Sequence, residues 1–249
     1  MNTVVDAHVA AGEHPSLPTL GVDALLQAMD DGGIERAVVG AVGRWVAVDN
    51  AEGNRTLAGW AQAHPDRLAF WATVSPWYGA RACAELERAF ADGACGLKLA
   101  PSVQGFGLLS PLLEPVLDVA EEHGRPVYVV TGVPVASEPL QLAELALRRP
   151  GLTFVMGRSG RTDFSLDLLP ALTTGPNLVA ETAYNGASLI ATLVATLGAD
   201  RVLFSSDAPF NDAGLELARA ERAGLADADR AAVLGGSATK LLLGGGASR

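Results

Sequence analysis

The hydrophobic positions of the chain form short, nearly continuous runs that alternate with longer periodic stretches. Residues 38–42 and 127–130 are apolar at almost every position, which is typical of strands buried on both faces of a parallel sheet. The pattern predicts eight strands, at residues 3–6, 37–42, 68–74, 94–99, 126–130, 153–157, 177–181 and 201–206.

Between the strands, apolar residues recur every three or four positions, as in helices that pack one face on a sheet. Seven helices are predicted, at residues 22–31, 51–63, 81–91, 112–122, 138–148, 167–172 and 187–197. The eight β/α cycles favour an α/β protein with a single (β/α)8 TIM barrel over residues 1–249, in which 244–249 form a frayed tail. A doubly wound open sheet is the alternative, but no Gly-x-Gly-x-x-Gly turn follows the first strand.

Composition narrows the classes of function. The 249 residues suit one barrel domain, and the net charge of -10 disfavours a nucleic-acid or anionic-membrane partner, because both need clustered Lys and Arg. No apolar stretch is long enough to span a membrane and no signal-peptide pattern opens the chain, so we expect a cytoplasmic protein. Cys83 and Cys95 are expected to be buried, reduced thiols.

Most of the residues that end or follow the predicted strands are polar. The active site of a β/α barrel lies at the carboxyl ends of its strands, so these positions are candidates for chemistry. They are His8, Arg44, Pro76, Lys98, Val130 with Thr131, Arg158, Glu181 and Asp207.

Segments at both ends of the chain resemble a metal-dependent hydrolase barrel. Asp6-Ala7-His8-Val9-Ala10 resembles a first strand in which Asp-x-His-x-His is expected, and residues 201–209 resemble a last strand that ends in Asp207. With residues 64–68, 96–99, 124–127 and 197–204, the chain resembles the amidohydrolase-related family from Val4 to about Leu243. That branch contains decarboxylases and lactonases of small aromatic or pyrone acids, so the resemblance implies a hydrolase or a lyase.

The resemblance also implies a set of metal ligands, and this chain keeps only part of it. The family's histidines fall on His8, Ala10, Val130 and Arg158, and its aspartate falls on Asp207. Alanine and valine carry no donor and arginine stays protonated, so none of the replacements can bind Zn²⁺. A catalytic zinc normally has about three protein ligands, so we expect neither a metal nor another cofactor.

Arg158, His8 and Asp207 are the predicted catalytic residues. Arg158 is a permanent cation that could pair with Asp207, bind a substrate carboxylate or stabilise an oxyanion. His8 and Asp207 are expected to move protons.

Contacts to a small, anionic substrate are expected from a second group of residues. Lys98, at the end of the fourth predicted strand, has an alternative role, because a buried lysine can form a Schiff base. The group is Lys98, Arg44, Thr131, Glu181, Tyr184 and Trp77.

Three functions remain open. The leading hypothesis is a metal-independent amidohydrolase-like enzyme that hydrolyses, decarboxylates or rearranges a small carboxylated or carbonyl substrate. The second is a non-catalytic barrel that serves as a binding or scaffold protein, with Val130 and Ala10 filling the former metal volume. The third is a metallohydrolase with non-standard ligands, such as Glu181 or His14. Assembly into a homo-oligomer is also left open.

Overall fold

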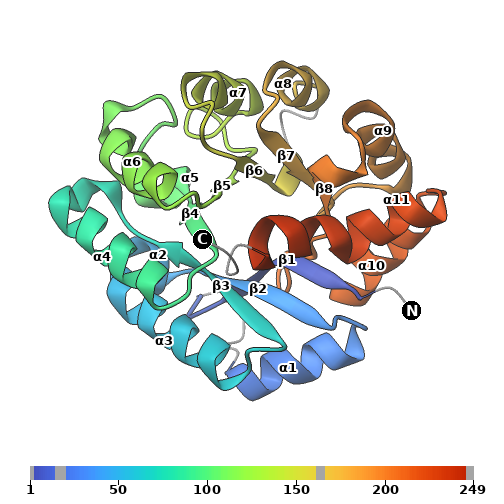
Figure 1. The fold of residues 1–249 in the computed structure, drawn as a ribbon, viewed down its shortest axis with the longest axis horizontal. Helices are drawn as coiled ribbons and strands as arrows, with labels where there is room; N and C mark the ends of the chain where they lie inside the picture. Colours follow the sequence, from blue (N-terminus) through green and yellow to red (C-terminus); the bar gives the residue numbers. More distant parts are fainter. Residues whose placement is uncertain (1–2, 15–20, 161–165, 245–249) are drawn as a thin grey trace.

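The computed structural model describes residues 3–14, 21–160 and 166–244, and eight parallel strands pair in chain order within it (Figure 1). Backbone bonds from Ala7 N to Phe204 O (2.9 Å) and from Asp207 N to His8 O (3.2 Å) connect the end of the sheet to its beginning. The predicted (β/α)8 barrel is therefore confirmed. Its strands are β1 (Val5–Ala11), β2 (Arg36–Ala41), β3 (Leu68–Thr73), β4 (Gly96–Leu99), β5 (Val127–Val130), β6 (Phe154–Gly157), β7 (Leu178–Glu181) and β8 (Val202–Leu203).

Two strands differ most from the prediction. β1 continues to Ala11, so His8 lies within the strand and not after it. β8 ends at Leu203: Phe204 O still accepts from Ala7 N of β1, but the main-chain nitrogens of the two residues after Phe204 bond to side chains. Ser205 N donates to Thr182 Oγ1 (3.1 Å), and Ser206 N donates to Asp6 Oδ1 (3.0 Å).

Helices surround the barrel (Figure 1). The seven predicted helices are confirmed as α1 (Val22–Asp31), α3 (Asn50–Ala63), α4 (Ala80–Ala91), α6 (Glu114–Glu122), α7 (Pro139–Arg148), α8 (Leu168–Thr174) and α9 (Ala187–Leu197). The pattern did not predict α2 (Arg44–Ala47), α5 (Pro101–Gln104), α10 (Ala213–Glu221) or α11 (Asp227–Ala231). Short 3₁₀ turns are η1 (Pro76–Tyr78), η2 (Pro111–Leu113), η3 (Arg158–Gly160) and η4 (Ala199–Arg201), and wide π turns are η5 (Ala232–Gly236) and η6 (Thr239–Leu243).

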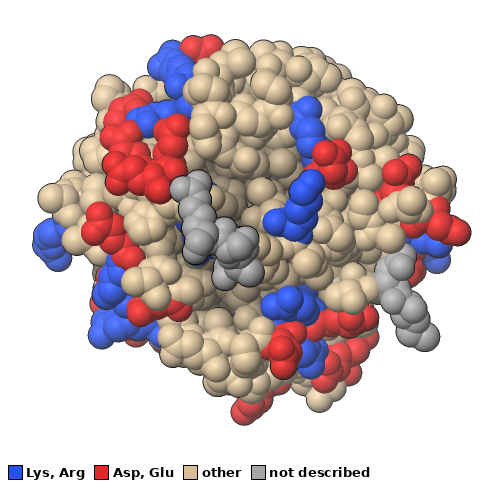
Figure 2. Space-filling model, viewed as in Figure 1, with Lys and Arg blue, Asp and Glu red and all other residues tan. Residues whose placement is uncertain are grey.

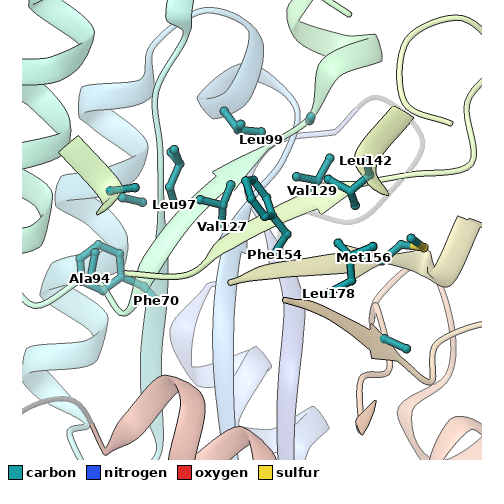
Figure 3. Packing of buried hydrophobic residues seen from close by; sticks show 14 of the residues in the cluster. Phe70, Ala94, Leu97, Leu99, Val127, Val129, Leu142, Phe154, Met156 and Leu178 are labelled. Carbon is teal, nitrogen blue, oxygen red and sulfur yellow. The ribbon is translucent and has the colours of Figure 1, made fainter. Parts of the chain in front are cut away.

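The hydrophobic core has two layers. Outward-facing strand residues such as Leu97, Val127 and Phe154 pack under the helices (Figure 3), while Trp71 and Tyr128 fill the barrel interior. The C-terminal segment closes the end of the barrel at which the strands begin. Its Leu242 joins the interior cluster, and its Val233 O accepts a bond from Phe204 N (2.9 Å). A functional site must therefore open at the other end.

Figure 2 shows acidic and basic side chains in small mixed groups around the rim of one face. Cys95 is buried as expected, whereas Cys83 is half-buried, and both are free thiols. None of the described helices is long and apolar enough to cross a membrane. The predicted frayed tail, apart from Gly244, lies outside the described residues.

Candidate functional site

A local irregularity in β1 turns His8 toward the barrel interior. Val5 and Ala7 belong to the interior cluster, and the pairing with β2 shifts register between Asp6 and Val9. The buried Asp6 Oδ1 accepts bonds from His8 N (3.1 Å) and Ser206 N (3.0 Å) at this point. Burial raises the pKa of Asp6 to about 7. Asp6 thus ties the shifted strand to the chain that follows β8.

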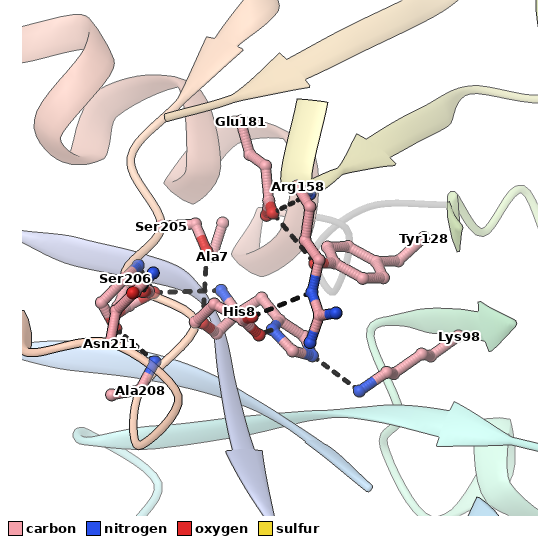
Figure 4. A network of polar contacts seen from close by, with 12 residues as sticks. Ala7, His8, Lys98, Tyr128, Arg158, Glu181, Ser205, Ser206, Ala208 and Asn211 are labelled. Atoms are coloured by element: carbon pink, nitrogen blue, oxygen red, sulfur yellow. Dashed lines mark hydrogen bonds and ion pairs between the residues drawn. The ribbon is translucent and has the colours of Figure 1, made fainter. Parts of the chain in front are cut away.

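His8 lies at the centre of a buried polar network (Figure 4). Its Nε2 lies 2.7 Å from Lys98 Nζ, its Nδ1 lies 3.1 Å from Asp207 Oδ1, and its ring stacks on Tyr128 at 4.5 Å. Burial, together with the neighbouring Lys98, lowers the pKa of His8 to about 4, so the ring is neutral near pH 7. We assign its proton to Nδ1, facing the carboxylate, and leave Nε2 to accept from Lys98.

Lys98 projects from β4 into this network with only 2% of its surface exposed. Its Nζ also donates to Ala41 O (2.9 Å), and burial lowers its pKa to about 7. Gly40 on β2 provides the space for it: a Cβ there would lie 2.7 Å from His8 Nε2 and 2.9 Å from Lys98 Cδ. The contact between His8 and Lys98 therefore requires glycine at position 40.

Asp207 receives hydrogen bonds and positive charge from several sides. Arg158 Nε and Tyr184 Oη donate to its Oδ2, at 3.0 and 2.9 Å. Burial alone would raise the pKa of Asp207, but the bond to His8 and the charges of Arg158 and Lys98 lower it. The carboxyl is therefore ionised, and it forms the ion pair with Arg158 that the sequence suggested.

Arg158 is the part of the network that solvent reaches. Its side chain is 31% exposed, whereas those of His8 and Asp207 are almost fully buried. The guanidinium carbon lies 5.2 Å from the Phe210 ring and 5.7 Å from the Tyr184 ring. Only its Nε has a hydrogen-bond partner among the described residues, so both η nitrogens can bind an anion.

Strained backbone is concentrated at this network. Arg158, Ser159, Tyr184 and Asp207 have positive φ of 60, 45, 66 and 54°, and Val135 is the one other such non-glycine residue in the described chain. Each costs about 1–3 kcal/mol, and such residues cluster at functional sites. The distribution of strain supports this end of the barrel as the functional site.

Glu181 and Thr131 lie beside the turn at residues 158–160 and are almost fully buried. Glu181 Oε1 accepts from Arg158 N and from Tyr128 Oη (3.1 Å), and Thr131 Oγ1 accepts from Gly160 N (2.8 Å). Burial and then the charge of Asp207 raise the pKa of Glu181 to about 8, so it is neutral near pH 7. Both residues contact the turn that carries Arg158, whereas the sequence predicted that they would contact a substrate.

Arg44 and Trp77 make their contacts elsewhere. Arg44 begins α2 and pairs with Glu52 and Asp49, and it lines a hollow of about 640 Å³. Trp77 is 61% exposed on η1, and its Nε1 donates to Gln104 O (2.9 Å). Substrate contact by these two side chains stays a prediction.

A sequence profile of the amidohydrolase family matches residues 5–243. The chain belongs to the amidohydrolase family. No curated protein matches it.

Several solved structures share the barrel of this member of the amidohydrolase family. 2,6-Dihydroxybenzoate decarboxylase from Rhizobium has a TM-score of 0.79 at 20% identity, with 99% of this chain and 100% of that chain covered. 5-Carboxyvanillate decarboxylase from Sphingomonas paucimobilis has a TM-score of 0.77 at 16% identity, over 98% and 99%. Dihydroxybenzoic acid decarboxylase from Polaromonas sp. JS666, with bound manganese and 2-nitroresorcinol, has a TM-score of 0.74 at 18% identity, over 98% and 97%.

The residues of this chain do not fit the metal ion that the family implies. His8 Nε2 is bonded to Lys98 and its Nδ1 faces Asp207, while Arg158 occupies the other side of that carboxylate. Ala10 and Val130 offer no donor. Within the described chain, no group of three or more His, Cys, Asp or Glu could hold a metal ion. Metal-independent activity is a separate matter and stays a prediction.

The sequence analysis missed Tyr128 and Phe210. Tyr128 supports the His8 ring and bonds to Glu181, and Phe210 packs against the Arg158 guanidinium. The two-residue period of a strand contained a signal for Tyr128: position 130 was assigned to the interior, so position 128 faces it too. Phe210 lies in a loop, where no such period applies.

Proposed function

We propose that this amidohydrolase binds a small aromatic carboxylate through Arg158 and removes its carboxyl group without a metal ion. The observation that carries the proposal is the fixed guanidinium, whose Nε is held by Asp207 while neither η nitrogen is bonded to a described residue. A guanidinium edge matches the two oxygens of a carboxylate, and the flanking Phe210 and Tyr184 rings suit a flat ligand.

The similar structures support this choice of reaction. By their names, all three decarboxylate benzoic acids that carry oxygen substituents, and one contains manganese. In this chain, Arg158 would supply the positive charge that anchors the acid. Its charge is permanent, so the role does not depend on pH in the neutral range.

Loss of CO₂ also needs a proton, because the carbon that loses its carboxyl group must gain one. Lys98, with its pKa lowered to about 7, can hold or release a proton near neutral pH. It donates to neutral His8, which in turn faces Asp207. We assign this chain of three side chains as the proton source and Arg158 as the anchor.

A screen for CO₂ release tests the proposal. Chelator-treated protein would be incubated with 2,6-dihydroxybenzoate, 5-carboxyvanillate and related hydroxybenzoates. We expect CO₂ from at least one compound, with a loss of at least ~100-fold in Arg158→Ala and none in Arg148→Ala, whose arginine lies on the outer helix α7. Activity that appears only after manganese or zinc is added would contradict the metal-free assignment.

The burial of the network favours a second candidate, a carboxylate-binding protein without turnover. His8, Lys98 and Asp207 are all covered, and Arg158 alone among the four faces solvent. This candidate predicts calorimetric binding of a hydroxybenzoate, dependent on Arg158, with no CO₂ released by any compound in the screen.

A further inference from the structure

The short turn that carries Arg158 has an uncommon backbone. Arg158, Ser159 and Gly160 follow β6 with φ of 60, 45 and 66°. Glycine adopts such values freely, but an arginine and a serine do so at a cost. The turn therefore needs support from the surrounding structure to keep this shape.

Glu181, the last residue of β7, supplies most of that support. Its Oε1 accepts from Arg158 N, and its main-chain oxygen accepts from Ser159 Oγ. Its own N donates to Ser159 Oγ (3.2 Å). Glu181 thus contacts both non-glycine residues that adopt the unfavourable positive φ, through its side chain and its backbone.

The barrel is shaped to hold this side chain in place. Glu181 is fully buried, and Tyr128 Oη donates to the same Oε1 from inside the barrel. Gly157 leaves room for that tyrosine, since a Cβ there would lie 2.5 Å from Tyr128 Cζ. The carboxyl is enclosed, so it cannot reach a ligand at the mouth without a rearrangement.

We propose that Glu181 is a positioning residue, which holds the turn at Arg158 and Ser159 so that the Arg158 guanidinium reaches Asp207. The positioning of the turn by Glu181 is inferred from these contacts alone. The expected effect of this positioning on carboxylate binding rests on the proposed function. The required property is an acceptor at Oε1, not a negative charge. Glutamine should therefore replace Glu181, whereas leucine should not.

The Nε–Hε group of Arg158 reports this positioning directly, because that proton is bonded to Asp207 Oδ2. Its nitrogen-15 NMR signal would be assigned by its disappearance in Arg158→Lys. We expect a signal with slow hydrogen exchange in the wild type and in Glu181→Gln. In Glu181→Leu we expect exchange to become at least ~10-fold faster, or the signal to vanish.

Further variants make the test specific. Tyr128→Phe removes the other bond to Oε1 and leaves Arg158 N untouched, so the Hε signal should persist. Glu181→Met also removes the acceptor, and its side chain is more flexible than that of leucine. It would be used in place of Glu181→Leu if the leucine variant does not fold. Loss of the signal in either apolar variant, with retention in glutamine and in Tyr128→Phe, supports the proposal.

Unchanged exchange in a folded apolar variant overturns it, as does loss of the signal in Glu181→Gln. In parallel, 2,6-dihydroxybenzoate affinity would be measured, with a ~10-fold loss expected in the apolar variants only. A wild type that binds no hydroxybenzoate refutes the proposed function but leaves the NMR result decisive for Glu181.

Discussion

Replacing Arg158 with alanine is expected to weaken carboxylate binding by about 30- to 1000-fold, or roughly 2–4 kcal/mol. Neither η nitrogen of Arg158 is bonded within the described part of the chain, and the other cation of the network, Lys98, is buried beside His8. Without Arg158, an incoming carboxylate would meet Asp207 with no cation between them. Calorimetric titration with the hydroxybenzoate that binds best would measure the change.

Two variants control this prediction. Arg158→Lys keeps the charge but lacks the planar fork, so it should recover only part of the affinity. Arg148→Ala removes an arginine that pairs with Glu144 on the outer surface of α7, and it should bind like the wild type. Affinity in Arg158→Ala within threefold of the wild type would remove Arg158 from the binding site.

Replacing Asp207 with asparagine is expected to lower the free energy of unfolding by about 3–5 kcal/mol. The asparagine keeps the shape but loses the negative charge that pairs with Arg158 and lies near Lys98. Arg158 then remains without its counter-charge in a region with little solvent, and Lys98, which loses the charge that raised its pKa, is driven toward its neutral form. Urea unfolding at pH 7 would give the difference.

A double variant tests whether charge imbalance is the cause. Arg158→Met combined with Asp207→Asn removes both members of the pair, so the double variant should be more stable than the sum of the single changes by about 1–3 kcal/mol. Additive effects would mean that Asp207 contributes mainly through its contacts with His8 and Tyr184.

The barrel could be predicted from the sequence because the strands and helices differ in hydrophobic period. The strand ends were predicted less well where main-chain nitrogens bond to side chains and not to a neighbouring strand. β1 was placed too short, since a period cannot show the irregularity that Asp6 stabilises, and β8 was placed too long, since Ser205 and Ser206 bond to side chains.

The sequence predicted which residues form the candidate site better than it predicted how they contact one another. His8, Lys98, Arg158, Glu181 and Asp207 were assigned from strand ends, and these ends converge in a parallel barrel. The contacts of Glu181 and Thr131 depend on a left-handed turn at Arg158 and Ser159. Arginine and serine do not predict such a turn, whereas glycine would. The contact of Glu181 and Thr131 with that turn therefore required the structure.

The central claim is that Arg158, and not a metal ion, binds the carboxylate. Titration of the wild type with a hydroxybenzoate, after chelation and again with manganese present, tests it most directly. We expect the same affinity in both titrations. Binding that is absent after chelation and restored by manganese would contradict it.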